Sequence, residues 1–420
     1  MTSLFRRFSL AQWMIIAAVA GVALGFAAPG FARQLSPISD IFLRLIRAII
    51  APLLFGVLVR AIAGAGETRN LGRIGLKAIV IFEVLTTIAL LLGWLAGVLV
   101  QPGVGVTLPR EASVPAAAPI SFVTVLINVF PTSIIDAMAR GDVLQIVAFS
   151  LLFGLAALSL GEKARPFLAF VDSLAEISFR FTRIIMLLAP AAVFAAMAVA
   201  IGGGGLNALA GLARFAGVAW AGQLFFLLVV LGGALLLARV PLARFAAHVR
   251  EPFLVAFATT SSAAALPQTL ENLERFGVPR PILGVVAPLS LSFNLCGSVI
   301  HLALATIFVA QAAGVNLTIE QQLMILVTLK LTSKGVAGIP RGNFVVLAAM
   351  FPSFGLPMEG LALLLGIDAL IDPVRTSVNV VGHSVSPALV ARWEGASLDG
   401  AAPADGAAKT AEDQAGNVRP

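Results

Sequence analysis

A series of long apolar stretches, separated by short segments that carry charge, constrains this chain more than any other feature. A helix needs roughly 20 apolar residues to cross the hydrocarbon core of a bilayer. Because the stretches reach or exceed that length, we predict an all-α, multi-pass membrane protein with about eight transmembrane helices. The stretches run over residues 11–29, 41–64, 78–100, 120–160, 167–201, 206–238, 282–312 and 360–391.

Composition excludes an ordinary soluble protein. Hydrophobic residues make up 59% of the chain and charged residues 12%, whereas soluble domains average about 25% charged residues. The formal net charge is +7, but the basic residues form short clusters between apolar stretches, which is typical of cytoplasmic loops and not of a nucleic-acid surface. The single cysteine, Cys296, excludes an intramolecular disulfide and a multi-thiolate metal site. We expect the lipid bilayer as a partner, no nucleic acid and no cofactor.

The distribution of basic residues predicts the orientation in the membrane. Alternate loops are rich in Lys and Arg, and such loops stay in the cytoplasm. Counting from the first loop places both termini in the cytoplasm. The first apolar stretch has no convincing cleavage site and is predicted to be a retained helix. The basic loops contain Arg6 and Arg7; Arg69, Arg73 and Lys77; Lys163 and Arg165; and Arg239, Arg244 and Arg250.

Two apolar segments contain small-residue breaks and are predicted to be re-entrant. Residues 251–280 are interrupted by the run Thr259–Pro267, and residues 323–357 by the run Ser333–Gly342. Non-helical backbone at membrane depth is tolerated only where protein or a water-filled cavity surrounds it. A matching pair of interrupted segments is typical of a transporter site between inverted repeats. Lys334, inside the second break, is expected to extend its ammonium group to water.

The last apolar stretch carries a polar stripe at helical spacing. Leaving Asp372 and Arg375 unpaired near the bilayer centre would cost roughly 5–7 kcal/mol together. Two interpretations stay open: a structural ion pair within the bundle, or a site where Arg375 binds a carboxylate and Asp372 an amine. The stripe consists of Asp368, Asp372, Arg375, Thr376, Asn379 and His383, which lie on one helix face.

Four segments in this order resemble the dicarboxylate/amino acid:cation symporter family, which contains the glutamate transporter homologues. They are the Ser261–Ser262 break that ends in Leu266–Pro267, the segment Asn294–Ser298, the break Ser333–Pro340, and the stripe Asp368–Asn379. The resemblance extends from the first span to about Trp393, and its specific motifs lie within residues 255–390.

The resemblance implies a homotrimer in a bacterial-type inner membrane, in which a transport domain moves by an elevator mechanism against a scaffold. Scaffold helices would occupy residues 1–76 and 119–201, and the transport domain residues 77–101 and 206–395. The transport domain would include hairpin 1 (250–281) and hairpin 2 (320–358). Composition predicts a disordered tail over residues 396–420.

The resemblance also implies the substrate contacts. Asp372 matches the aspartate that meets a substrate amino group, and Arg375 the arginine that pairs with an acidic side chain. A secondary active symporter of acidic amino acids or C4-dicarboxylates is therefore expected. The implied substrate-binding residues are Ser261, Ser262, Ser298, Ile339, Asp372, Arg375, Thr376 and Asn379.

The chain departs from the sodium-dependent members of that family at two positions. Cys296 and His383 stand where those members have aspartates. Because Na⁺ prefers oxygen ligands and histidine titrates near neutral pH, we predict coupling to H⁺ rather than Na⁺, with Glu83 and His383 as carriers. The alternative for His383 is a neutral imidazole on a backbone carbonyl, and for Cys296 a small buried hydrophobe. The candidate coupling residues are Glu83, Thr86, Thr87, Asn294, Cys296, Asn379 and His383, with residual Na⁺ sites considered at Asn294 and Asn379.

Other function classes fit less well. The metalloprotease and serine-hydrolase motifs are absent, and Asp368 and Asp372 lie on one helix, unlike the facing pair of an aspartyl protease. We therefore predict that the chain is not an enzyme. A carrier of C4-dicarboxylates only, or a channel-like or transport-impaired member that lost its sodium sites, remains the alternative.

Overall fold

The computed structural model describes residues 10–64, 72–106, 108, 127, 130–336 and 342–398, and this part is all-helical without a strand. Ile339 and residues 399–420 of the predicted tail (396–420) lie outside the described residues. The tail prediction is wrong for Leu398, which is buried and whose carbonyl accepts a hydrogen bond from Arg244. The helices of the first half are α1 (Leu10–Ala27), α2 (Pro29–Ala32), η1 (Arg33–Leu35), α3 (Ser36–Gly64), α4 (Gly72–Val100), α6 (Ile134–Arg140), α7 (Val143–Leu160), η3 (Gly161–Ala164) and α8 (Arg165–Met186).

The second half begins with one long helix, α9, and ends with another, α17. Its elements are α9 (Ala189–Phe225), the π-helical η4 (Phe226–Leu231), α10 (Gly232–Leu237), α11 (Leu242–Thr259), α12 (Ser262–Phe276), α13 (Arg280–Phe293), α14 (Cys296–Ala312), α15 (Ile319–Thr332), η5 (Ser333–Val336), α16 (Gly342–Ser353) and α17 (Met358–Trp393).

Among the described residues, five helical segments are long and apolar enough to cross a membrane. They cover Pro29–Arg60, Gly72–Val100, Gln145–Met186, Ala189–Leu237 and Arg280–Ala312. The chain is therefore built as a multi-pass membrane protein, and the number of eight crossings stays a prediction.

The predicted division between the spans 167–201 and 206–238 is confirmed by a break in the helical backbone. Within α9, Gly205 has φ 56° and ψ −138°, which is not helical, so two helical segments meet at a kink there. Glycine adopts a positive φ without a Cβ penalty, so the glycine-rich segment permits this change of direction. The predicted span 167–201 is also divided at Leu187–Leu188, between α8 and α9.

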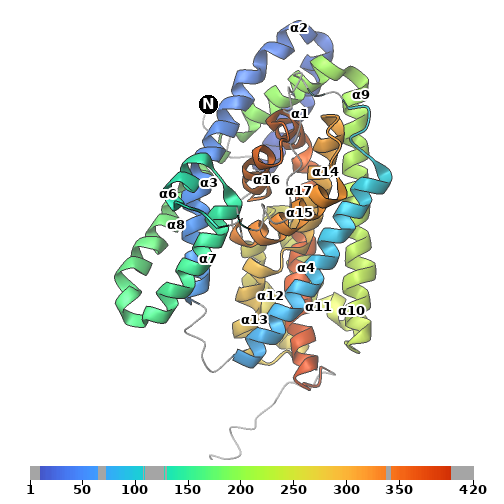
Figure 1. The fold of residues 1–420 in the computed structure, drawn as a ribbon. Helices are drawn as coiled ribbons and strands as arrows, with labels where there is room; N and C mark the ends of the chain where they lie inside the picture. Colours follow the sequence, from blue (N-terminus) through green and yellow to red (C-terminus); the bar gives the residue numbers. More distant parts are fainter. Residues whose placement is uncertain are drawn as a thin grey trace, which may run out of the picture.

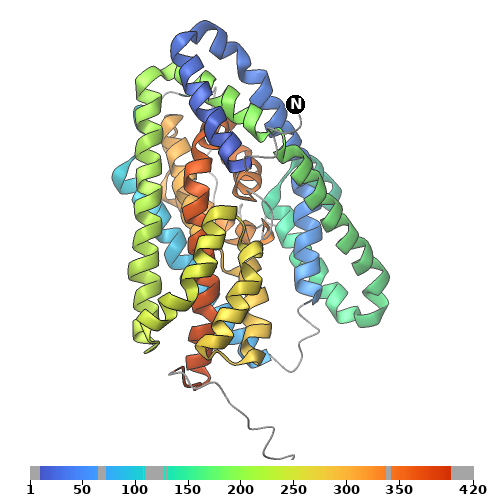
Figure 2. The ribbon, with the colours of Figure 1, turned by 180° about the vertical axis from the view of Figure 1, so that it is seen from behind.

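The helices form two groups of contacts. In the first, α3 packs against α7 and α8, and the rings of Phe55, Phe149 and Phe153 contact one another in this group. In the second, α17 packs against α9, α11, α13 and α14, and α4 packs against α13 and α14. Figure 1 and Figure 2 show α3, α7 and α8 as a column beside the second group.

Both interrupted segments are pairs of helices with a break between them. The first break follows α11, where Thr260 has a left-handed φ of 51° and Ser261 caps α12 by accepting a hydrogen bond from the Ala264 amide. The second follows α15 and η5. In Figure 1, α11 and α12 lie in the lower half of the molecule and α15 and α16 in the upper half. This placement agrees with segments that enter the protein from opposite ends.

Small residues allow the helices of the second group to approach closely. Lipid tails are as apolar as leucine, so membrane helices associate through close packing and hydrogen bonds. A Cβ added at Gly93 of α4 would lie 2.2 Å from the Ile300 carbonyl oxygen of α14, and one at Gly297 would lie 2.3 Å from the Arg375 carbonyl oxygen. The contacts that position α14 between α4 and α17 therefore require glycine.

An ionic cluster joins α4 to the end of α17. Glu394 accepts a hydrogen bond from Arg73 and pairs with Lys77 at 2.6 Å, and Lys77 also contacts the Trp393 ring. The hydrogen bond from Lys77 lowers the pKa of the Glu394 carboxyl below its ordinary value. This contribution to stability is therefore present above the ordinary carboxyl pKa and is lost as the pH falls through the lowered one.

The close contact at Gly93 can be tested by adding one methyl group. We expect Gly93→Ala to lower stability by about 1–3 kcal/mol because it overpacks the α4–α14 contact. Gly75→Ala is the matched control on the same helix, because a Cβ there meets nothing within 4 Å, and better helix propensity should leave it neutral or slightly stabilised. Thermal unfolding of the purified variants in detergent is the measurement. Equal midpoints for the two variants would contradict the packing described above.

Candidate functional site

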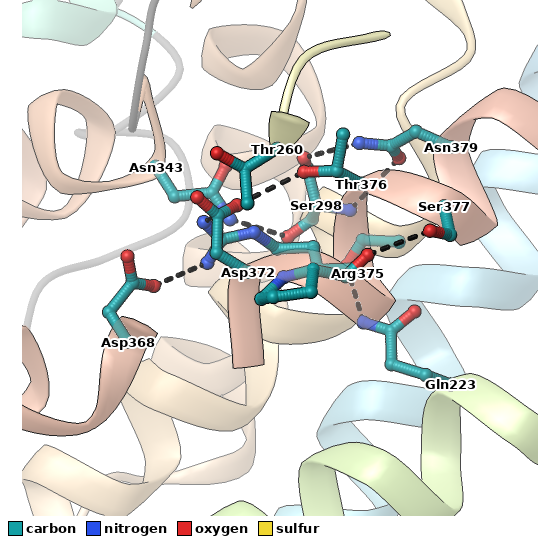
Figure 3. Close-up of polar contacts among 12 residues, drawn as sticks. Gln223, Thr260, Ser298, Asn343, Asp368, Asp372, Arg375, Thr376, Ser377 and Asn379 are labelled. Carbon is teal, nitrogen blue, oxygen red and sulfur yellow. Dashed lines mark hydrogen bonds and ion pairs between the residues drawn. The ribbon is translucent and has the colours of Figure 1, made fainter. Parts of the chain in front are cut away.

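A buried ion cluster lies in the middle of α17. The two terminal nitrogens of Arg375 donate to Asp368 Oδ1 at 2.7 Å and to Asp372 Oδ1 at 2.6 Å. The exposed fractions of Asp368, Asp372 and Arg375 are 0%, 6% and 2%. The spacing of three and four residues places all three on one helix face, as the polar stripe predicted, and Figure 3 shows them side by side.

The ion pair required by the structural interpretation of this stripe is therefore present. Its two carboxylates face one guanidinium, so the cluster carries a formal charge of −1. The planar guanidinium is well suited to binding carboxylates at its fixed donors. An incoming carboxylate can use the same donors, so the observed pairing is also the geometry that the ligand-binding interpretation needs.

Neutral polar groups surround the ion cluster. Thr376 donates to Asp372 Oδ1 at 3.1 Å. Asn379 and Ser298 form a reciprocal pair, in which the Ser298 amide donates to Asn379 Oδ1 and Asn379 Nδ2 donates to Ser298 Oγ. Asn343 of α16 donates to the Ser298 carbonyl at 3.3 Å. Residues from α14, α16 and α17 are thus linked around one point, as Figure 3 shows.

The first helix break supplies the serines that the sequence analysis selected. Ser261 and Ser262 lie at the start of α12, and both α11 and α12 pack against α17. Figure 3 draws Thr260, the residue before Ser261, together with the α17 cluster. Of the eight predicted substrate residues, the structure describes seven, because Ile339 lies outside the described residues.

Asn294 organises a second polar cluster where the chain unwinds between α13 and α14. Its Nδ2 donates to the Gly382 carbonyl and to Ser386 Oγ, and its Oδ1 accepts from the Cys296 thiol at 2.9 Å. The His383 ring hydrogen-bonds to the Asn294 backbone, as one of the two interpretations of His383 requires. The oxygens of Asn294 are therefore engaged by a thiol and an imidazole, and the part of the chain described here contains no group of three His, Cys, Asp or Glu able to hold a metal ion.

Glu83 belongs to a third cluster that the sequence analysis recognised only in part. Its carboxylate pairs with Lys330 at 2.9 Å and with Lys334. Lys330 also donates to Thr87 Oγ1 at 2.5 Å, while Thr86 donates to the Phe82 carbonyl. The prediction that Lys334 extends to water is wrong, because its ammonium is mostly buried against Glu83. Lys330, one helical turn before Lys334, was the sequence signal for this cluster.

Two further buried residues were missed. Gln223 of α9 donates to the Gly297 carbonyl at 2.8 Å, and His301 is 1% exposed on α14. The signal for His301 was its position, because a residue three places after Ser298 lies near it on the helix surface. Gln223 lies in an apolar stretch far from every motif, so no sequence signal marked it.

The energetic role of Asp368 can be measured directly. Asp368→Asn removes one partner of a buried guanidinium, and breaking such a pair costs about 3–5 kcal/mol. The matched control is Asp136→Asn, which breaks the half-exposed pair with Arg140 and should cost at most about 1 kcal/mol. Thermal unfolding in detergent compares the two variants. If the unfolding temperature of Asp368→Asn falls no further than that of the control, the cluster does not stabilise the fold.

Comparisons with known proteins identify the family of this chain. The model of the sodium:dicarboxylate symporter family matches residues 10–393. A proton/sodium-glutamate symport protein of Geobacillus stearothermophilus is 38% identical over 402 residues, covering 93% of this chain and 96% of the relative. A C4-dicarboxylate transport protein of Anaeromyxobacter sp. (strain K) is 39% identical over 396 residues, covering 92% and 90% of the two chains.

A third relative is the proton/glutamate-aspartate symporter of Bacillus subtilis (strain 168), which is 37% identical over 392 residues, covering 92% of this chain and 95% of the relative. The relatives are transporters and not enzymes. On the family match and these identities over most of its length, the chain belongs to the sodium:dicarboxylate symporter family.

Proposed function

We propose that this protein is a secondary active symporter that takes up acidic amino acids or C4-dicarboxylates, driven by a cation gradient. The observation that carries the proposal is the buried Arg375 held between Asp368 and Asp372. An intramembrane ion cluster of this kind is a functional site by default. The printed names of the relatives, which include glutamate, aspartate and C4-dicarboxylate transport, support the same class of substrate.

The substrate would bind by exchanging partners within the cluster. A substrate side-chain carboxylate would take a place on the Arg375 guanidinium, whose planar N–H groups can donate to two carboxylate oxygens. Asp372 would then be free to accept from a substrate ammonium group. Ser298, Thr376 and Asn379, with Ser261 and Ser262 from the first break and Ile339 from the second, would bind the remaining polar groups. The buried charges stay paired before and after this exchange, which avoids the cost of an isolated ion.

Asp372 favours an acidic amino acid over a plain dicarboxylate. A dicarboxylate would place a second anionic group near the Asp372 carboxylate, and like charges repel in a low-dielectric site. An amino acid places its ammonium group there instead. The C4-dicarboxylate carriers among the relatives keep a dicarboxylate substrate as the alternative.

We further propose that the coupling ion is H⁺ rather than Na⁺. Na⁺ requires several oxygen ligands, and the Asn294 oxygens are engaged by Cys296 and His383. Glu83 and His383 are the candidate proton carriers, and both are ionisable groups within helices of the membrane region. A residual Na⁺ site on Asn294 and Asn379, with Thr86 and Thr87 on α4, is the competing arrangement.

Transport by an elevator mechanism in a homotrimer is the proposed mode of action. The packing of α3, α7 and α8 as one group, and of α4 with α13, α14 and α17 as another, supports a scaffold (1–76 and 119–201) and a transport domain (77–101 and 206–395). The boundary between residues 201 and 206 coincides with the kink at Gly205. The protein would lie in a bacterial inner membrane with both termini in the cytoplasm.

The choice of coupling ion is tested by uptake into proteoliposomes. We expect radiolabelled L-aspartate or L-glutamate to accumulate when only an inward proton gradient is imposed, and not when only an inward sodium gradient is imposed. The controls are liposomes without protein and proteoliposomes whose ion gradient is dissipated by an ionophore. Accumulation that requires sodium would overturn the proton assignment, and no accumulation of these substrates or of succinate under either gradient would overturn the proposed function.

The role of Asp372 predicts a change in selectivity. Asp372→Asn removes the negative charge that would pair with a substrate ammonium group, so uptake of L-aspartate should fall by at least about tenfold while uptake of succinate stays the same or rises. Asp368→Asn is the comparison, because it weakens the support of Arg375 and should lower both uptakes together. An equal fall for aspartate and succinate in Asp372→Asn would show that Asp372 does not recognise the amino group.

A further inference from the structure

His301 is a buried histidine for which neither the sequence pattern nor the substrate site accounts. It lies on α14, three residues after Ser298, and is 1% exposed. Neither of its ring nitrogens has a hydrogen-bond partner among the described residues. A buried polar group without a partner is costly and requires a specific explanation.

The register of two helices places His301 beside the ion cluster. Gly297 of α14 lies against the Arg375 carbonyl of α17, and Val309 lies against Gly360. The two helices are therefore antiparallel, and His301 is level with the segment between Asp368 and Asp372. In agreement with this register, the charges of Arg375 and Asp372 act on the His301 ring.

The other helices that pack against α14 bring no competing charge to this ring. From α9, the Phe215 ring contacts it edge-on, with centroids 5.8 Å apart, and the adjacent Arg214 is exposed. Glu83 of α4 and Lys330 of α15 pair with each other. The described helix α16 contains no ionisable side chain. Among the described residues, the charges that act on His301 are therefore those of the proposed substrate site.

His301 differs in this respect from the two other histidines of the chain. His383 hydrogen-bonds to the Asn294 backbone. His248 lies on α11 with Nδ1 at 2.8 Å from the Arg244 carbonyl. Only His301 combines two unpartnered nitrogens with an electrostatic link to Arg375 and Asp372.

This electrostatic link can couple substrate binding to proton binding. A buried imidazole stays neutral unless enough negative charge lies near it, because burying an ion is costly. A substrate carboxylate on Arg375 would add negative charge and favour a protonated imidazole, whose ordinary titration range is near neutral pH. Coupling between two ligands is reciprocal, so a proton on His301 would also strengthen substrate binding.

We propose that His301 is a proton-binding residue of this transporter and that its protonation is favoured when a carboxylate substrate occupies Arg375. The inference deepens the proposed function and rests on it. It adds a site beside the substrate to the predicted carriers Glu83 and His383.

The first test uses His301→Gln, which keeps a polar side chain but cannot bind a proton at neutral pH. In the wild type, the L-aspartate concentration that half-saturates exchange should rise by up to about tenfold per pH unit above the transition, as linkage to one proton requires. In His301→Gln, exchange should persist with a weaker pH dependence, and accumulation driven by a proton gradient should fall. His248→Gln is the matched control and should behave as the wild type.

The second test reads the ring directly and does not depend on the folding of His301→Gln. The chain has three histidines, so labelled-histidine NMR of the full protein gives three imidazole signals, which His248→Gln and His383→Gln assign by elimination. At one fixed pH, adding L-aspartate should convert the His301 signal from the neutral to the protonated form.

The two tests separate the failure of this inference from that of the proposed function. If the wild type accumulates L-aspartate on a proton gradient while the His301 ring stays neutral with substrate bound, or if His301→Gln keeps the wild-type pH dependence, the inference is overturned and the proposed function stands. If the wild type accumulates no acidic substrate under either gradient, the proposed function itself fails.

Discussion

A charge inside a bilayer must keep a partner, and this constraint governs the arrangement around α17. Arg375 is held by Asp368 and Asp372, and most of the remaining residues of that helix are buried in protein. The helices that cover it approach closely because glycine lies at their contacts, as at Gly297. The cluster is thus shielded from lipid but has donors that a carboxylate can share, which is the basis of the proposed substrate site.

Two of the three polar clusters share α14 and α17, and the third lies close to them. Ser298 and Cys296 begin the same helix, so the Asn294 cluster is only a few residues from the substrate cluster. His301 follows one turn later. Lys334, which pairs with Glu83, lies 5.6 Å from the Phe293 ring beside Asn294. Groups that can bind a proton therefore lie close to the charge on Arg375.

Much of this arrangement could be predicted from sequence, because its signals are periodic or local. The apolar stretches predicted the multi-pass helical class, and the spacing from Asp368 to His383 predicted the shared helix face. The partners of these residues could not be predicted, because pairing between Glu83 and Lys330 or between Cys296 and Asn294 depends on how distant helices pack. The glycine-rich run before residue 206 correctly predicted a division of the helix at Gly205, because glycine permits the positive φ that interrupts the helix there.

The central claim is that an acidic substrate takes a place on Arg375. An electron cryomicroscopy structure of the protein with L-aspartate in a lipid nanodisc tests it most directly. We expect a substrate carboxylate within hydrogen-bond distance of the Arg375 guanidinium and the substrate ammonium group beside Asp372. A bound substrate elsewhere, with Arg375 still paired to both Asp368 and Asp372, would contradict the account.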